Sequence, residues 1–354
     1  MAAGAGHTCA VTGPSDVDGD VICWGTNKDH ELGDGSNTDQ LRPGSVLGVS
    51  RARAVAAGSY HTCALDSDGA VSCWGWNVSG QVGDGTTVDR DTAFSVPDVP
   101  TASAIAAGDA HSCALVADGS ARCWGQNDLG QLGDGSQVDR GHPAGVFSLP
   151  VAIDLAASGH HTCAVLVDGG GVQCWGGNQR GELGDGTLLA HSLPQPVLAV
   201  NHAVAVAAGY NHSCALVADG RVFCWGANSY GQLGDGTTAD RAAPVQVQVL
   251  PAARSITAGF QHTCAVIADG SGWCWGWNDG GELGDGTLTS RAIPAPINGL
   301  SEVSTIAGGG FHSCAATTTG DVACWGANDS GQIGTGATTA SEATPIVVVH
   351  ETPH

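Results

Sequence analysis

The chain has 354 residues, of which 55 are glycine and only 13% are charged. Its formal net charge is −22, and Lys28 is its single lysine. This balance argues against direct nucleic-acid binding, which relies on Lys and Arg neutralising phosphates, and no apolar run approaches the roughly 18 residues of a membrane-spanning helix.

One segment of about 50 residues repeats along the whole chain, which is typical of propeller and solenoid architectures. Between residues 104 and 150 we predict short strands at 104–108, 111–115 and 121–125 and a weak fourth strand at 145–147. A hairpin turn at 117–119 joins the second strand to the third, and a long loop at 127–143 follows the third. Four short strands repeated seven times predict an all-β fold, a seven-bladed β-propeller with antiparallel blades that forms a single domain over residues 1–354.

Each repeat contains two cysteines. Cys63 and Cys73 are equidistant from Asp68 in the turn, so they lie opposite each other on one face of a two-stranded hairpin, at the distance a disulfide requires. Where the spacing is longer, the extra residues fall in the turn, around Pro14–Val17 in the first repeat and at Gly169–Gly171 in the fourth. We therefore predict one disulfide per blade, from the pairs Cys9 and Cys23, Cys63 and Cys73, Cys113 and Cys123, Cys163 and Cys174, Cys214 and Cys224, Cys264 and Cys274, and Cys314 and Cys324.

A metal site is the alternative interpretation of these residues. His61 and Cys63 point to the same strand face, and with Cys73 they offer three soft ligands for zinc or copper. A fourth ligand does not recur at a suitable spacing, so the disulfide remains the favoured interpretation. The segment from Asp16 to Asp20 alternates carboxylates as calcium loops do, but it lacks the completing Glu.

A histidine recurs before the first cysteine of every repeat. Either it fixes a local hydrogen bond of each blade, or the seven imidazoles form a ring at the channel mouth that gathers an anion or a metal ion. The first interpretation is favoured, and we expect no cofactor. The seven histidines are His7, His61, His111, His161, His212, His262 and His312.

The motif Ala-Ala-Gly-x-x-His-Thr-Cys-Ala-Leu, followed by Asp-Gly-x-Val-x-Cys-Trp-Gly-x-Asn-x-x-Gly-Gln-Leu-Gly-Asp-Gly, resembles the regulator of chromosome condensation repeat family. The resemblance extends over nearly the whole chain and implies a seven-bladed propeller. Members of that family include a nuclear exchange factor, a plant UV-B photoreceptor and secreted bacterial inhibitors of β-lactamases. Because one fold serves unrelated functions, the activity does not follow from the resemblance.

Departures from the family pattern narrow the choice of function. The photoreceptor relies on tryptophans in Gly-Trp-Arg-His-Thr segments, and here the Trp-Arg positions hold other residues, such as Ser59-Tyr60, which argues against light sensing. An acidic, disulfide-bonded chain fits poorly beside chromatin, which argues against a nuclear exchange factor. Paired cysteines indicate an oxidising compartment. We therefore expect a protein of bacterial type, secreted or periplasmic, whose signal peptide is not part of this sequence, and which is similar in character to the propeller-type β-lactamase inhibitory proteins.

Function is expected where the repeats differ. The dipeptide between Gly and His varies from blade to blade, and if the family geometry holds, these dipeptides surround one end of the channel. We expect a non-enzymatic, monomeric protein that binds another protein on this face, with aromatic side chains as anchors. Alternatives are a metal- or small-ligand-binding propeller that uses the histidine ring, and a structural surface module of a larger secreted protein. The predicted partner-binding residues are Tyr60, Asp109, His160, Tyr210, Asn211, Phe260, Gln261 and Phe311, together with the non-repeated Trp76 and Trp277.

Overall fold

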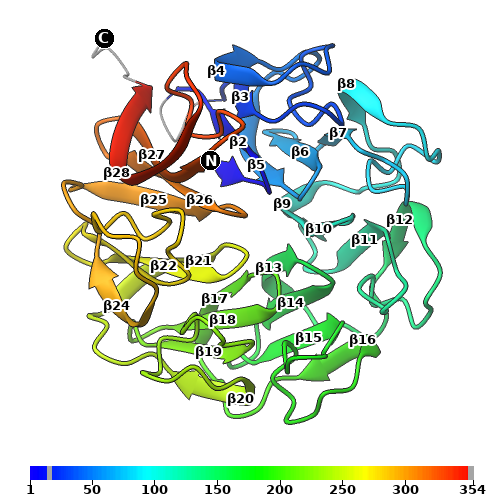
Figure 1. Cartoon of the computed structure of the whole chain (residues 1–354). Coiled ribbons are helices and arrows are strands. Elements are labelled where there is room, and N and C mark those ends of the chain that lie inside the picture. The colour runs from blue at the N-terminus through cyan, green and yellow to red at the C-terminus, as the bar shows by residue number, and fades with distance from the viewer. Residues whose placement is uncertain (14–17, 350–354) are drawn as a thin grey trace.

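The computed structural model describes residues 1–13 and 18–349, in which every regular element is a β-strand. The strands form seven four-stranded antiparallel sheets, which stand as blades around a central channel (Figure 1). We number the blades 1 to 7 in chain order. The predicted all-β, seven-bladed propeller is confirmed. Among the described residues no helix is long and apolar enough to cross a membrane.

Each blade runs outward from the channel in chain order. The innermost strands are β1 (Ala2–Ala3), β5 (Ala52–Ala57), β9 (Ala102–Ala107), β13 (Ala152–Ser158), β17 (Ala203–Ala208), β21 (Ala253–Ala258) and β25 (Val303–Gly308). The second strands are β2 (His7–Val11), β6 (His61–Asp66), β10 (His111–Val116), β14 (His161–Leu166), β18 (His212–Val217), β22 (His262–Ile267) and β26 (His312–Thr317). The third strands are β3 (Val21–Gly25), β7 (Val71–Gly75), β11 (Ala121–Gly125), β15 (Val172–Gly176), β19 (Val222–Gly226), β23 (Gly272–Gly276) and β27 (Val322–Asn328). The outer strands are β4 (Gln40–Ser45), β8 (Arg90–Ser95), β12 (Arg140–Gly145), β16 (His191–Pro196), β20 (Arg241–Gln246), β24 (Arg291–Pro296) and β28 (Thr339–Val349).

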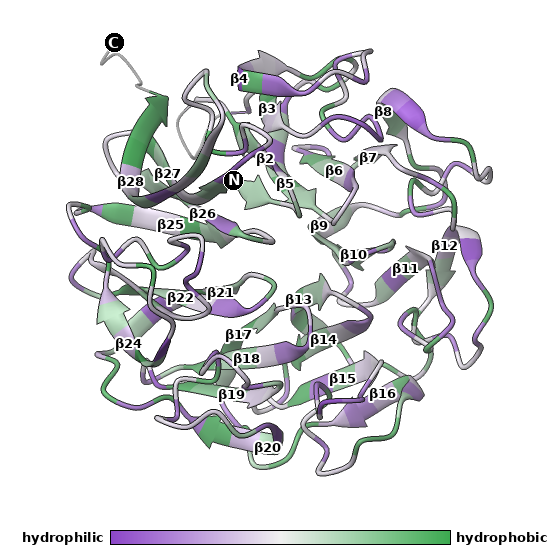
Figure 2. Ribbon diagram, viewed as in Figure 1, coloured by the Kyte–Doolittle hydropathy of each residue, from purple (hydrophilic) through white to green (hydrophobic). Residues whose placement is uncertain are grey.

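The outer strand is the element that the sequence placed least well. In blade 3 it was expected at residues 145–147, but β12 spans Arg140–Gly145, so the predicted position was wrong. An outer strand pairs on one side only, and in β12 Pro143 is the only buried residue. It therefore lacks the alternating apolar pattern that identifies a strand in a sequence. Figure 2 shows the same contrast between the hydrophobic inner strands, such as β17, and the hydrophilic stretches of β8 and β12.

The seven disulfides form as predicted, one in each blade. Cys63 on β6 lies directly opposite Cys73 on β7 in the strand register, and their Cα atoms are 4.1 Å apart. The longer spacing in blade 4 is absorbed by the turn between β14 and β15, as expected. The inserted residues of blade 1, Pro14–Val17, lie outside the described residues, and so does part of the calcium-like segment that starts at Asp16.

The seam between neighbouring blades is organised around one backbone carbonyl. Between blades 1 and 2, the carbonyl oxygen of Glu31 accepts hydrogen bonds from Trp74 Nε1 and Thr62 Oγ1, both at 2.8 Å. Nε2 of His7 lies 2.9 Å from the same threonine hydroxyl. Trp74, like the other six repeated tryptophans, is fully buried. Each seam therefore ties together three side chains and a loop of two blades.

The ring closes by repeating this arrangement between blades 7 and 1. The Gln332 carbonyl accepts hydrogen bonds from Trp24 Nε1 and Thr8 Oγ1, both at 2.9 Å, and His312 Nε2 lies 2.7 Å from Thr8 Oγ1. Strand β28 completes blade 7 and β1 belongs to blade 1, so among the described residues no strand is exchanged between the two. The last and first blades are therefore joined in the same way as the other six pairs.

Candidate functional site at the channel mouth

The variable dipeptides lie where the first strand of each blade turns into the second, at one end of the channel, which we call the mouth. The long loop after the third strand reaches the same end, since the backbone N–H of Trp76 donates to Tyr60 O at 2.9 Å. Dipeptides of neighbouring blades also bond to each other, for example from Asp109 N to Gly159 O at 3.1 Å. These backbone bonds hold the side chains of the mouth on a fixed platform.

Six rings form a continuous chain of contacts across blades 4 to 7, which we call the aromatic belt. Its members, in order of contact, are His160, Tyr210, Phe260, Phe311, Trp277 and Tyr230. Successive ring centroids are 4.3–6.4 Å apart, mostly edge to face, as favoured by aromatic quadrupoles. Phe311 is 43% exposed, and the other members are partly buried. The belt is thus an ordered apolar surface open to a partner.

The other predicted binding residues also lie at the mouth. Tyr60, 42% exposed, stacks edge to face on Trp76 with centroids 5.8 Å apart in blade 2. Asp109 and Gln261 line a cavity between Tyr60 and the belt. Asn211 follows Tyr210 and lines a pocket at the same end. The ten predicted residues are therefore brought to one face.

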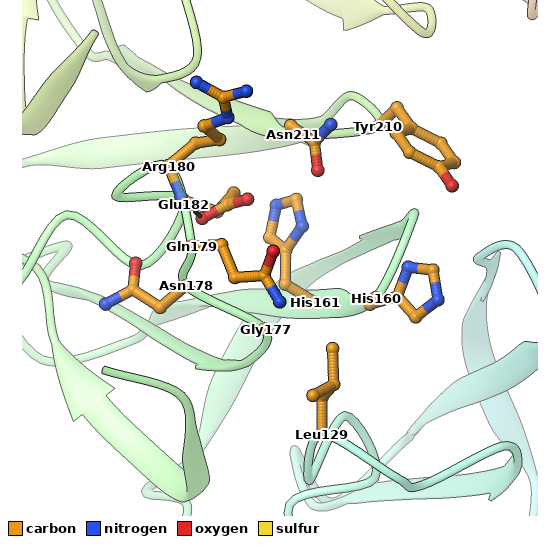
Figure 3. A pocket seen from close by; sticks show the side chains of 10 residues that line it. All are labelled: Leu129, His160, His161, Gly177, Asn178, Gln179, Arg180, Glu182, Tyr210 and Asn211. Atoms are coloured by element: carbon orange, nitrogen blue, oxygen red, sulfur yellow. Dashed lines mark hydrogen bonds between the residues drawn. The ribbon is translucent and has the colours of Figure 1, made fainter. Parts of the chain in front are cut away.

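A pocket of about 330 Å³ opens beside the belt in blade 4 (Figure 3). Leu129 forms one wall, His160 and Tyr210 form another, and Gln179, Arg180 and the other labelled side chains surround the remainder. Gly177 lines the pocket without a side chain. It occupies the position after Cys-Trp-Gly that holds Trp76 in blade 2 and Trp277 in blade 6, and a Cβ there would lie 3.2 Å from Leu129 Cδ1.

Two residues of the mouth were missed in the sequence. Tyr230 ends the belt, with its ring 4.3 Å from that of Trp277. Arg180 lines the blade-4 pocket and pairs with Asp240 at 3.2 Å. Both lie in the loop after the third strand, two residues beyond the repeated Asn, at a position that varies between repeats as the dipeptides do. That variation between repeats was the signal by which the sequence could have identified both residues as part of the mouth.

The seven repeated histidines do not form a ring at the channel mouth, so that alternative is wrong. All are at most 1% exposed, and the channel is lined instead by residues of the innermost strands and of the loops that follow them, most of them Ala and Gly. Each imidazole Nε2 lies 2.7–3.0 Å from a Ser or Thr hydroxyl of the next blade. The favoured interpretation, a fixed hydrogen bond, is correct except that the bond crosses between blades.

The seam fixes the protonation of these histidines. The single hydroxyl proton of Thr62 goes to the Glu31 carbonyl, so the Nε2–H of His7 donates to Thr62 Oγ1. Nδ1 of His7 has no hydrogen-bond partner among the described residues, so a second proton there would be buried without an acceptor. Burial accordingly lowers the pKa of His7 to about 3 and that of His61 to about 4.

Three seams carry a buried glutamate where the other four carry glutamine. In Glu31, Oε2 accepts from Asp29 N at 2.9 Å, while Oε1 has no partner among the described residues. Burial raises the pKa of Glu31 and of Glu282 to about 7, and it also raises the pKa of Glu182. A carboxyl whose pKa is raised on folding costs stability as the pH rises from its unfolded value to its folded value.

We expect Glu31→Gln to stabilise the propeller at pH 8 by roughly 2 kcal/mol in the free energy of unfolding, and by less than half of that at pH 5.5, because the penalty on the carboxyl grows as the pH rises from its unfolded to its folded pKa. Urea denaturation at both pH values measures this. Gln81→Glu, at the same position of blade 2, is the reciprocal control and should destabilise more at pH 8 than at pH 5.5. Equal effects of either variant at the two pH values would contradict the assignment.

The repeated Asp of Leu-Gly-Asp-Gly braces the long loop. In blade 2, Asp84 accepts hydrogen bonds from Asn77, Thr86 and Arg90. Among the described residues, no group of three or more His, Cys, Asp or Glu side chains is arranged to hold a metal ion. The loop carboxylates brace the loop through the hydrogen bonds just given.

Comparison with known proteins agrees with this architecture. The RCC1-like domain model matches residues 141–353, and two models of the regulator of chromosome condensation (RCC1) repeat match residues 18–65 and 68–115 and residues 52–81 and 102–131. None of the curated proteins matches the chain in sequence.

Solved structures share the fold over nearly the whole chain. Yeast RCC1 (Prp20), crystallised with Kap60, has 26% identity and a TM-score of 0.85 over 95% of this chain and 84% of its own. Prp20p from Saccharomyces cerevisiae, described with its binding to Gsp1p and histones, has 26% identity and a TM-score of 0.83 over 96% and 90%. Human WBSCR16 has 22% identity and a TM-score of 0.84 over 93% and 94%. With seven matched blades and a family model that spans more than half of its length, the chain belongs to the RCC1-like domain family.

Proposed function

We propose that this chain is a non-enzymatic propeller that binds another protein at the mouth of its channel. The observation that carries the proposal is the aromatic belt, six connected rings on four consecutive blades. Aromatic side chains held on a rigid platform supply large contact area with little loss of conformational entropy. Yeast Prp20, which shares this fold, is described bound to Kap60 and with its binding to Gsp1p and histones.

The groups best suited to acid–base chemistry support a binding role over catalysis. The repeated histidines are buried and hydrogen-bonded in the seams. The repeated aspartates are hydrogen-bonded within the long loops. What differs between blades is the apolar and polar surface of the mouth.

The finer proposal concerns compartment and partner. Seven disulfides favour a secreted or periplasmic protein, since such bonds persist in oxidising compartments. Together with the resemblance to secreted bacterial propellers, this favours a β-lactamase or a related penicillin-binding enzyme as the partner, with the belt covering the enzyme's active-site entrance.

The test replaces the four largest anchors of the dipeptides, Tyr60, Tyr210, Phe260 and Phe311, with alanine. Surface plasmon resonance against a purified class A β-lactamase and a penicillin-binding protein is expected to show binding that weakens at least 100-fold in the variant, because each central aromatic anchor contributes on the order of 2 kcal/mol. Phe147→Ala is the matched control, since Phe147 is 62% exposed and follows the end of β12 away from the mouth.

The possible outcomes distinguish the proposed interface at the mouth from the proposed identity of the partner. Binding that is unchanged in the fourfold variant contradicts the mouth as the interface. Failure of both enzymes to bind, with capture of a different secreted protein that the fourfold variant loses, contradicts only the β-lactamase version.

A further inference from the structure

A second cavity lies over the channel, between Tyr60 and the aromatic belt. It has a volume of about 220 Å³ and is lined by Ser59, Tyr60, Asp109, Tyr210, Phe260 and Gln261. These residues come from blades 2, 3, 5 and 6, so opposite sides of the ring meet around one space, which we call the cup. The cup is smaller than the roughly 300–1,000 Å³ of sites for drug-sized ligands, and it suits a single side chain.

Three aromatic rings form the walls of the cup. The rings of Tyr210 and Phe260 have centroids 5.0 Å apart and are tilted by 53°, so they present differently oriented faces. Tyr60 stands on the other side, held by its edge-to-face contact with Trp76. Aromatic faces arranged around one space attract a cation through the negative potential above each ring.

One carboxylate faces this space. Asp109 is anchored by its backbone N–H, but its side chain forms no hydrogen bond or ion pair with any described residue. After burial, the charge of Asp109 is the largest contribution that raises the pKa of Tyr210, so the carboxylate and the phenol interact across the cup. Among the residues that the structure describes, no Lys or Arg lines the cup. Arg180 lines the pocket in blade 4 and is already paired with Asp240.

We propose that the cup binds the cationic side chain of a lysine or arginine presented by the partner protein. The aliphatic stem packs against the rings, and the charged end meets the faces of Tyr60 and Tyr210 and the Asp109 carboxylate. A net charge of −22 favours a partner whose docking surface is basic. This inference rests on the proposed function and specifies which kind of partner side chain binds at the centre of the interface.

The test uses small probes, so it does not require the partner. N-acetyl-lysine methylamide and N-acetyl-arginine methylamide are titrated against the whole protein by ligand-observed NMR, with neutral N-acetyl-norleucine methylamide for comparison. We expect the cationic probes to bind at least five-fold more tightly than the norleucine probe. Asp109→Asn should weaken them about three- to ten-fold, and Tyr210→Ala should abolish binding. Asp279→Asn, an exposed carboxylate of the same face outside the cup, should have no effect.

Two results would overturn the proposal. One is equal affinity for the lysine and norleucine probes, which would make the cup a plain apolar hollow. The other is an Asp109→Asn variant that is folded, by an unchanged melting temperature, and binds the cationic probes as the Asp279→Asn variant does. Either result leaves protein binding at the belt intact, because the fourfold alanine test measures that separately.

Discussion

Lowering the pH from 7 to about 4.5 is expected to unfold the propeller in one steep transition. Each of the seven seams contains a histidine that folding keeps neutral, with pKa values of about 3 for five of them and about 4 for His61 and His262. In the unfolded chain these imidazoles take up protons near pH 6.5. Below that pH the unfolded state therefore binds more protons than the folded state, and stability is lost as the pH falls towards the folded pKa values.

The buried glutamates oppose this effect but do not cancel it. Between about pH 4.5 and pH 7 up to three of them hold a proton in the folded state only, which leaves a net uptake of about four protons on unfolding. That uptake corresponds to roughly 5 kcal/mol per pH unit near pH 5.5, a large part of the 5–15 kcal/mol typical of total stability.

Urea denaturation at half-unit steps from pH 7.5 to pH 5 measures the slope. A His111→Gln variant, which keeps a side-chain N–H to donate to Thr162, removes one titrating group and should reduce the slope by roughly 1 kcal/mol per pH unit. A wild-type slope that corresponds to one proton or fewer would contradict the assignment of neutral, buried seam histidines.

Reduction of all seven disulfides is expected to prevent the chain from folding. Each bond closes a loop of about ten residues and stabilises the fold by roughly 2–3 kcal/mol through the entropy of the unfolded chain, so their sum is comparable to the whole stability of a protein domain. The sulfurs are at most 1% exposed, so reduction requires prior unfolding. The experiment is therefore denaturation with reductant, alkylation, removal of denaturant and circular dichroism, with unreduced protein refolded in parallel.

A variant that lacks only one disulfide measures what a single bond contributes to the free energy of unfolding. Replacing both Cys113 and Cys123 with alanine should lower the free energy of unfolding by about 2–3 kcal/mol and leave the protein folded. Refolding of the fully alkylated chain to a native spectrum would show that the hydrophobic cores and seams are sufficient without the disulfides.

The fold was readable from the sequence because its signals are local and repeated. The equal distances of Cys63 and Cys73 from Asp68 correctly predicted their register, and β11 lies at the predicted Ala121–Gly125. The outer strand β12 was misplaced because an exposed edge with Gly141, Pro143 and Gly145 has no apolar alternation. The bond from His7 to Thr62 was not readable, since it joins residues 55 positions apart across a seam that periodicity does not describe.

The candidate site was readable only in part. Variation between repeats correctly placed Tyr210, Phe260 and Phe311 at the mouth, but it did not show that their rings touch. Tyr230 was missed because its contribution depends on a contact with the next blade. The pocket in blade 4 was missed for a related reason, since its lining comes from loops of different blades, such as those of Leu129, Arg180 and Tyr210.

The closure of the ring has a consequence for how such proteins diversify. Every blade is a contiguous segment, and the join between blades 7 and 1 uses the same bonds as the other joins. The ring therefore does not depend on which blade comes first in the chain. A gene could begin at any blade boundary and still encode the same ring, so circular permutation is compatible with the fold. One blade could equally be exchanged for another without redesigning a closing strand, which lets the mouth change its specificity one sector at a time.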